Sequence, residues 1–254
     1  MKTGFIAVLL SIFNVSCSFA AESGGAIRNV EIEALNARER SIIPISAFTA
    51  NGNIVRLKSA LIDGLDAGLS VNEIKEILVQ LYAYCGFPRS LNAIHAFMGV
   101  MQEREAKGTK DTIGKEASPL PKDMDKDAYG AKVRRELAGV SKEAPAQGYQ
   151  LFTPVIDVYL KEHLFADIFA RDVLSHRDRE LVTISALSAM SATEGQLKFH
   201  LGAAMNTGFN SAQMHAFIAL LNSKVGHHEA EVAGKVLSDV VQMRQSTDEK
   251  MVGG

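Results

Sequence analysis

Five side chains in the stretch from Arg177 to Gly226 are of types that move protons or bind anions. They are Arg177, Arg179, Glu180, Glu194 and His200. Carboxylate and imidazole groups exchange protons with a reacting molecule, and histidine suits this role because its side chain ordinarily titrates near neutral pH. Arginine binds carboxylates through paired hydrogen bonds. These five residues are therefore the candidates for acid–base chemistry.

Each candidate also has a structural explanation. His200 could be hydrogen-bonded into an interface between subunits. Glu180 and Glu194 are expected in first helical turns, where acidic side chains interact favourably with the helix dipole. Arg177 and Arg179 could be solvated or form structural ion pairs. The sequence alone leaves both interpretations open.

Two other groups of side chains are weaker candidates. His227 and Glu231 are four residues apart, which suits two metal ligands on one helix face. Zinc sites usually have three or four protein ligands, and a third at a fitting spacing is not evident, even with His215 nearby. We therefore predict no metal site. Cys85 lies in the apolar sequence YAYCGFP and is predicted to be a buried, inert thiol.

Helical patterns must position these residues. Apolar side chains recur at helical spacing, and Asn36 with Glu39 and Ser70 with Glu73 form capping boxes that start two of the helices. Pro44 is expected to kink the first helix, and Gly86 to stop the third. The first part of the chain predicts helices at about 37–49, 54–67, 71–84 and 89–105.

The same boundary signals recur later in the chain. Arg38 aligns with Arg177 at an offset of 139, and after the first helix the offset becomes 140, so that Gly86 aligns with Gly226. Thr193 is the expected N-cap of the helix that carries His200. Recurrence of so many boundaries predicts an internal duplication and an all-α fold with two copies of one helical repeat. In the first copy, Ser41 and Ala60 occupy the positions of Glu180 and His200.

Residues 177–183, RDRELVT, and His200 to Gly208 resemble motifs of the carboxymuconolactone decarboxylase and alkylhydroperoxidase-D-like superfamily. Tyr82 to Phe97, YAYCGFPRSLNAIHAF, is similar to the closing segment of the family's repeat. The resemblance covers most of residues 35–105 and 150–240. It implies an all-α duplicated fold that assembles into trimers or hexamers.

The resemblance to the peroxidase branch fails at its redox centre. That branch uses a glutamate, a Cys-x-x-Cys pair and a histidine. Glu180 and His200 are one residue further apart than in that pattern, and the cysteine positions counted back from His200 hold Thr193 and Gln196. A thiol is the nucleophile that such chemistry requires. A peroxiredoxin-like antioxidant activity is therefore disfavoured, although Cys85 keeps it open to test.

The resemblance to the decarboxylase branch implies a cofactor-free lyase or isomerase acting on a small carboxylated or lactone substrate. Such a reaction needs a cation for carboxylates, donors for a developing oxyanion and an acid that delivers a proton. In this interpretation His200 carries the proton, Glu180 orients it or acts as base, and Glu194 is a second carboxylate nearby. Arg177 and Arg179 bind a substrate carboxylate. The remaining alternative is a non-catalytic helical scaffold or small-molecule binder.

The chain divides into four predicted parts. Residues 1–20 resemble a secretory signal, with Lys2 before an apolar core and small residues before Ala21; lipidation of Cys17 is the alternative. Residues 28–106 form the first repeat and residues 107–128 a charged linker or mobile loop. Residues 129–250 form the second repeat, in which two weaker helices precede the repeated motif that begins at Leu174. The mature protein is expected to be periplasmic or secreted, which argues against an intracellular role in aromatic degradation.

Composition limits the range of partners. The formal net charge is −2 and tryptophan is absent, so neither a basic face nor a stacking platform for nucleic acid is expected. After the signal, no apolar run approaches the length of about 20 residues that spans a bilayer. We therefore expect a small-molecule substrate, with no nucleic acid and no membrane span.

Overall fold

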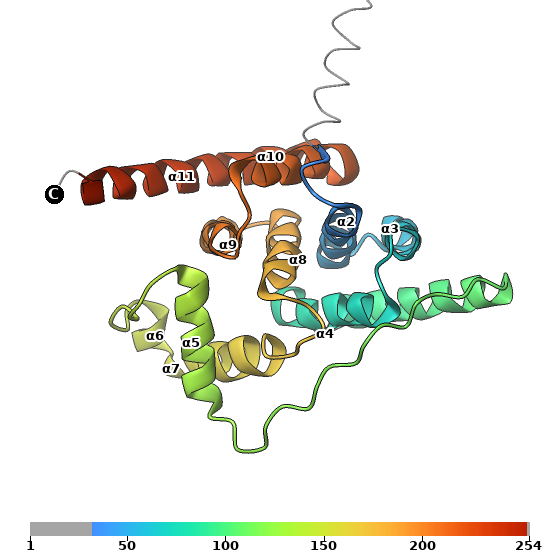
Figure 1. Cartoon of the computed structure of the whole chain (residues 1–254), viewed down its shortest axis with the longest axis horizontal. Helices are drawn as coiled ribbons and strands as arrows, with labels where there is room; N and C mark the ends of the chain where they lie inside the picture. The colour runs from blue at the N-terminus through green and yellow to red at the C-terminus, as the bar shows by residue number, and fades with distance from the viewer. Residues whose placement is uncertain (1–31, 253–254) are drawn as a thin grey trace, which may run out of the picture.

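The computed structural model describes residues 32–252, and every regular element in this range is a helix (Figure 1). The predicted signal peptide and Cys17 lie outside the described residues. The elements in chain order are α2 (Ala37–Asn51), α3 (Ile54–Asp66), α4 (Val71–Ala106), α5 (Lys126–Ala138), α6 (Tyr149–Phe152), α7 (Pro154–Val158), the π-helix η1 (Tyr159–Ile168), α8 (His176–Ser188), α9 (Glu194–Asn206), α10 (Ser211–Leu220), the π-helix η2 (Leu221–Val225) and α11 (His227–Val252).

Reciprocal capping boxes begin α2, α4, α8 and α10, with N-cap residues Asn36, Ser70, Ser175 and Asn210. Each N-cap side chain accepts a hydrogen bond from the backbone three residues later, as the sequence predicts. The prediction for Thr193 is wrong in one respect. It precedes α9, but its hydroxyl donates to the carbonyl oxygens of Leu187 and Met190 and closes the turn after α8.

Two helices predicted on either side of Gly86 form one bent helix, α4. Gly86 has φ 82° and ψ 158°, a left-handed φ that glycine adopts without steric cost, and the helix resumes beyond it. The predicted interruption is therefore present in the backbone. In α2, the helix continues through Pro44 to Asn51.

The duplication is visible in the packing. Helices α2, α3 and the first half of α4 in the first repeat correspond to α8, α9 and α10 with η2 in the second. Helices α2 and α8 pack against each other near the centre (Figure 1). Helix α4 also packs on α8, and η2 packs on α2. Each repeat thus places its third helix against the first helix of the other repeat.

Two ion pairs join the repeats at equivalent positions. Arg38 donates to Asp178 at 2.7 Å, and Arg177 donates to Glu39 at 3.0 Å. Since Arg38 aligns with Arg177 and Glu39 with Asp178, the two pairs are one contact repeated by the pseudo-symmetry. Both carboxylates also accept from the N-cap backbone of their own helices. The same side chains therefore cap α2 and α8 and hold them together.

Replacing Arg38 with methionine should destabilise the protein at neutral pH and much less in acid. Burial opposes ionisation of Asp178, but hydrogen bonding and charge attraction from Arg38 outweigh it and lower the pKa of Asp178. A carboxyl with a depressed folded-state pKa stabilises the fold above its unfolded pKa, and the contribution is lost as pH falls through the folded value. We expect a loss of about 1–3 kcal/mol at pH 7, measured by urea unfolding, that narrows below about pH 3.5.

Lys132→Met is the matched control for Arg38. The Lys132–Glu136 pair is 3.7 Å long and both side chains are more than half exposed, so its removal should leave stability nearly unchanged. Arg38 also pairs with Glu73 at 2.7 Å, so a pH-independent loss in the Arg38 variant would show that its ion pairs with Asp178 and Glu73 are not the cause.

The predicted linker, residues 107–128, has no helix before α5 begins at Lys126. It is nevertheless held in place, because the carbonyl oxygens of Thr112 and Ile113 accept hydrogen bonds from the first backbone N–H groups of α4, at 2.9 Å each. Arg104 pairs with Asp111, and Ser118 donates to Asp172. These contacts fix the segment along α4 and lead the chain to α5 (Figure 1).

The part of the chain before Leu174, predicted as two weaker helices at the start of the second repeat, forms α5 through η1 and has its own small core. Helices α5 and η1 cross closely at Gly130. A Cβ atom at this position would lie 1.9 Å from the carbonyl oxygen of Lys161. Phe165 and Phe169 of this region pack edge-to-face and face Ala203 of the second repeat.

Gly130→Ala is expected to destabilise this region by about 1–3 kcal/mol, because a backbone oxygen cannot move aside without separating α5 from η1. Gly99→Ala on α4 is the control, since a Cβ there meets no atom within 4 Å. The control should be neutral or stabilise by up to about 1 kcal/mol, because alanine favours helix. Thermal unfolding of both variants measures the difference, and equal melting temperatures would contradict the close crossing.

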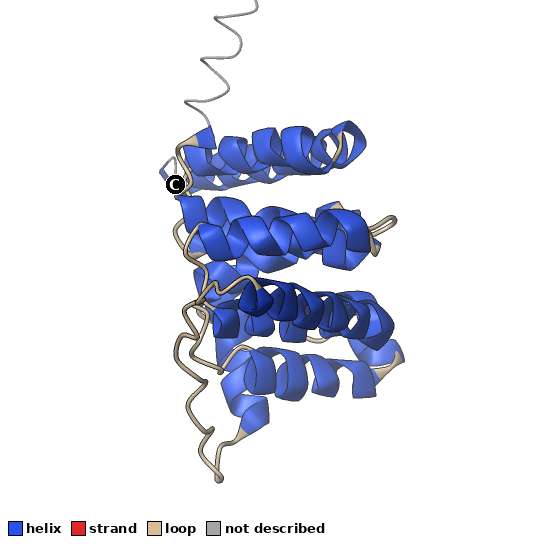
Figure 2. Ribbon diagram, turned by 90° about the vertical axis from the view of Figure 1, so that its right-hand side faces the viewer, coloured by secondary structure: helices blue, strands red, loops and turns tan. Residues whose placement is uncertain are grey.

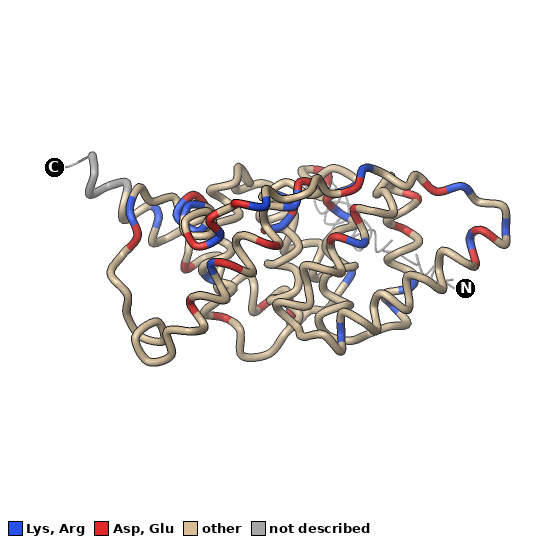
Figure 3. The backbone as a smooth tube through the Cα atoms, turned by 90° about the horizontal axis from the view of Figure 1, so that it is seen from below, with Lys and Arg blue, Asp and Glu red and all other residues tan. Residues whose placement is uncertain are grey.

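The helices stack in layers when viewed from the side (Figure 2). Acidic and basic residues lie intermingled along them, in keeping with the small net charge (Figure 3). Within residues 32–252, none of the helices has the length and apolar character needed to cross a membrane.

Candidate functional site

Glu180 and His200 form a buried pair in the second repeat. Glu180 projects from the second turn of α8 and His200 from α9, and Oε2 of Glu180 lies 2.8 Å from Nδ1 of His200. Glu180 is 0% exposed and His200 is 6% exposed. Because Glu180 lies beyond the first turn, the helix-dipole explanation does not apply to it. The carboxylate fixes the orientation of the ring and leaves Nε2 as the nitrogen that can face a ligand.

Tyr84 joins this pair from the first repeat. Its ring meets the His200 ring edge-on at 5.8 Å between centroids, and Phe199 meets His200 in the same manner at 5.1 Å. Burial and the charge of Glu180 both oppose ionisation of the hydroxyl and raise the pKa of Tyr84. Tyr84 therefore remains a neutral hydrogen-bond donor at physiological pH.

Unpaired polar atoms gather around this pair. Among the side chains that the structure describes, three buried polar atoms have no hydrogen-bond partner: the Tyr84 hydroxyl, Oε1 of Glu180 and Nε of Arg179. Buried polar groups are nearly always hydrogen-bonded, and exceptions point to strain or to a missing ligand or water. All three come from α4 and α8 around Glu180. Next to the oriented imidazole of His200, the Tyr84 hydroxyl and Oε1 of Glu180 are thus a donor and an acceptor without partners among the described residues.

A model of the carboxymuconolactone decarboxylase family matches residues 21–98 and residues 158–233, more than half of the chain. The chain belongs to this family. The two matched segments correspond to the two helical repeats. No curated protein matches the chain.

Arg179 of this family member is completely buried, and both terminal nitrogens of its guanidinium are hydrogen-bonded within the protein. Its guanidinium donates to Gln80 at 3.0 Å, to the carbonyl oxygen of Arg171 at 2.7 Å and to Glu76 at 3.4 Å. Gln80 in turn donates to the Arg179 carbonyl oxygen and to Thr183. This geometry argues against a substrate contact and favours the structural alternative, in which Arg179 joins α8 to α4.

Arg177 is also paired within the fold. It donates to Glu39 and stacks on Phe209, with its guanidinium carbon 3.5 Å from the ring centroid. We expected Arg177 and Arg179 to bind a substrate carboxylate, and their contacts do not support this role. The reason is the duplication, since the position of Arg177 is the position of Arg38, and both hold the repeats together.

Glu194 lies apart from the pair. It is exposed in the first turn of α9, whereas His200 is buried, and no hydrogen bond links it to the site residues within the described chain. A favourable interaction of the Glu194 carboxylate with the dipole of α9 explains an acidic residue at this position. The structure thus brings together Glu180 and His200 and leaves Glu194 outside.

Thr193 and Gln196, which occupy the cysteine positions of the peroxidase branch, have no thiol role in the fold. Thr193 bonds to the end of α8, and Gln196 is exposed on α9. Cys85 is half-buried and donates to the carbonyl oxygen of Leu81 at 3.1 Å. Burial raises the pKa of the Cys85 thiol, although Arg89 opposes this, so little reactive thiolate forms at neutral pH.

Two further histidines considered as metal ligands make local contacts. His227 pairs with Asn222 on the preceding π-helix, and His215 lies 3.5 Å from Ser211. Across the described residues, no three His, Cys, Asp or Glu side chains approach one another closely enough to bind one metal ion.

Tyr84 is the site residue that the sequence did not reveal. It lies about 100 positions before Glu180, in the repeat that lacks the Glu–His pair. Tyr84 reaches the site because α4 of the first repeat packs against α8 of the second, and no local sequence pattern predicts this packing.

Proposed function

We propose that this protein is a cofactor-independent lyase or isomerase that acts on a small carboxylated lactone through the Glu180–His200 pair. Its membership of the carboxymuconolactone decarboxylase family supports this substrate class. The observation that carries the proposal is the 2.8 Å contact between Glu180 and His200, buried beside the unpaired Tyr84 hydroxyl.

The proposed reaction needs one proton. The bond between the substrate carbon and its carboxylate breaks, carbon dioxide leaves, and the electron pair passes into the conjugated lactone carbonyl as an enolate. His200, protonated from solvent, then delivers a proton from Nε2 to the carbon, and a carbon–hydrogen bond forms. Glu180 holds the ring through Nδ1 and stabilises the imidazolium. The Tyr84 hydroxyl donates to the enolate oxygen, where charge develops in the transition state.

The proposal uses neither arginine as a substrate ligand. A cation paired with the departing carboxylate would stabilise the substrate more than the transition state, because that charge moves away as carbon dioxide forms. Interactions that favour the ground state in this way do not raise kcat. The apolar surroundings of His200, with Phe199 and Tyr84 against its ring, suit a carboxylate that must lose its charge.

Export and self-association belong to the same proposal. Residues 1–20 direct the chain to the periplasm or outside the cell, with lipidation of Cys17 as the alternative. Assembly into a trimer or hexamer covers large apolar side chains on the second half of α4, where Phe87 is 62% exposed and Met98 is 53% exposed. Such a surface in one protomer is typical of a protein–protein interface.

The test is a carbon dioxide release assay on the purified mature protein. The substrates are 4-carboxymuconolactone and related unsaturated γ-lactone acids, each compared with its methyl ester, which has no carboxylate to lose. We expect catalysed release from at least one acid and none from its ester. A parallel assay measures reduction of cumene hydroperoxide with a dithiol.

Hydroperoxide turnover that disappears in a Cys85→Ser variant, without release of carbon dioxide, would replace this proposal with the antioxidant alternative. Inactivity toward every acid and every peroxide would favour the non-catalytic binder.

A further inference from the structure

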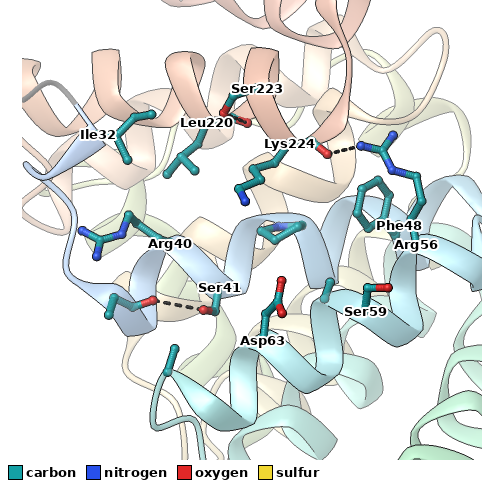
Figure 4. A pocket seen from close by; sticks show the side chains of 14 residues that line it. Ile32, Arg40, Ser41, Phe48, Arg56, Ser59, Asp63, Leu220, Ser223 and Lys224 are labelled. Carbon is teal, nitrogen blue, oxygen red and sulfur yellow. Dashed lines mark hydrogen bonds between the residues drawn. The ribbon is translucent and has the colours of Figure 1, made fainter. Parts of the chain in front are cut away.

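The first repeat contains a pocket of about 520 Å³ between α2, α3 and η2 (Figure 4). Ser41 and Ala60 lie in its wall, with apolar surface from Pro44, Phe48 and Leu220. The volume falls within the range of small-molecule sites, about 300–1,000 Å³. The wall combines apolar groups with a few polar ones, as such sites usually do.

This pocket is the counterpart of the Glu180–His200 site. Ser41 stands where the second repeat has Glu180, and Ala60 stands where it has His200. Lys224 aligns with Tyr84 at the offset of 140 and reaches the pocket from η2 of the other repeat, as Tyr84 reaches the Glu180 site from α4. Small side chains in place of a carboxylate and an imidazole leave open volume here and remove the proton-transfer groups.

Charge in the pocket is mainly positive. Lys224, Arg40 and Arg56 line it together with one carboxylate, Asp63. Arg56 stacks on Phe48 and donates to the carbonyl oxygens of Lys224 and Val225, which fixes the wall formed by η2. Arg40 donates to the Leu35 carbonyl oxygen at one end of the pocket. Lys224 extends toward the middle (Figure 4), and within the described chain it lies more than 4.0 Å from every carboxylate oxygen, since no ion pair includes it.

We infer that this pocket is a second, non-catalytic binding site for a small organic carboxylate with an apolar body. The ammonium of Lys224 binds the carboxylate, and Ser59 supplies a hydroxyl group nearby, whereas the Ser41 hydroxyl donates to the Ala37 carbonyl oxygen within α2. Pro44 and Leu220 contact the apolar body. The inference is independent of the reaction at Glu180, because it rests on a different cavity with different residues.

Ligand titrations followed by methyl NMR test this site in the full mature protein. The probes are benzoate and adipate, with benzamide and adipamide as neutral counterparts. We expect the carboxylates to shift the methyl signals of Ala60 and Leu220 and to leave Leu201, next to His200, unchanged. Lys224→Met should weaken benzoate binding by about tenfold or more, since it removes the charge and keeps the apolar stem. Lys58→Met, an exposed lysine on α3 that does not line the pocket, should bind as the wild type does.

A second variant fills the pocket, so that the test does not depend on replacing Lys224 alone. Ser59→Phe installs the residue that the second repeat carries at Phe199 and should abolish binding of charged and neutral probes alike. The inference is overturned if neither carboxylate shifts Ala60 and Leu220 at millimolar concentration. Equal binding of benzoate and benzamide, or equal affinity of the Lys224→Met variant, would overturn it as well.

Discussion

His200→Asn is expected to lower kcat for decarboxylation by about 10²- to 10⁴-fold, the usual contribution of a positioned general acid. Asparagine can still hydrogen-bond to Glu180 and fill part of the space, but it cannot carry a proton at neutral pH. Because the side chain is buried and contacts Tyr84 and Phe199, the melting temperature should be measured alongside kcat to separate catalysis from folding.

Glu194→Gln is the matched control for His200. Glu194 lies on the same helix but is exposed, so neutralising it should leave kcat within about twofold of the wild type, as expected of a surface residue away from the site. Wild-type kcat in the His200 variant would remove the proton-transfer role. An equal loss of kcat in the Glu194 variant would show that activity depends on α9 as a whole and not specifically on His200.

Arg179→Met is expected to destabilise the protein by about 3–5 kcal/mol, the range for removing one partner of a buried charge pair. The variant leaves Gln80 and the Arg171 carbonyl oxygen without their donor and leaves Glu76 with Arg171 alone. Since these partners join α4 of the first repeat to α8 of the second, the repeats should separate more easily. Chemical denaturation measures the free energy of unfolding.

Arg40→Met provides a comparison within the same molecule. Arg40 occupies the position of Arg179 in the first repeat but is half-buried, and within residues 32–252 its side chain makes one hydrogen bond, to the Leu35 carbonyl oxygen. Its replacement should cost about 1 kcal/mol. If the Arg179 variant were no less stable than the Arg40 variant, the buried network would not be what holds α8 to α4.

Local signals in the sequence were sufficient to predict the repeated framework. The capping boxes predicted at Asn36 and Ser70, and the interruption predicted at Gly86, each depend on a few adjacent residues, and the structure has all three. The recurrence of these boundaries led to the second copy, where capping boxes begin α8 and α10. The proximity of Glu180 and His200 follows from the same framework. Their helices are consecutive and pack against each other, so their contact needs no distant element.

What the sequence could not predict depends on packing between the repeats. The packing of α4 against α8 brings Tyr84 to one site, and the packing of η2 against α2 brings Lys224 to the other. The residues that meet in this way are about 100 to 180 positions apart in the chain. Burial likewise separates Arg179 from the more exposed Arg40, although both occupy the same place in the motif. Residue type alone left a substrate contact and a structural ion pair equally open for both arginines of α8, and only their contacts in the fold favour the structural interpretation.

The linker illustrates the same limit. Its composition predicted a linker or mobile loop over residues 107–128, because few apolar side chains are present to bury, and the structure has no helix there before Lys126. Composition did not reveal that the carbonyl oxygens of Thr112 and Ile113 satisfy the free N–H groups at the start of α4. Such backbone partners leave no trace in side-chain patterns.

A double-mutant cycle on kcat/KM for carbon dioxide release tests most directly whether Glu180 and His200 act as one unit. The variants are Glu180→Gln, His200→Asn and the combination, with melting temperatures recorded for each. If Glu180 works by orienting His200, each single variant has a kcat/KM about 10²-fold or more below that of the wild type. The kcat/KM of the double variant is then no lower than that of the less active single variant. Losses that multiply, or a Glu180→Gln variant that retains wild-type activity, would contradict the account.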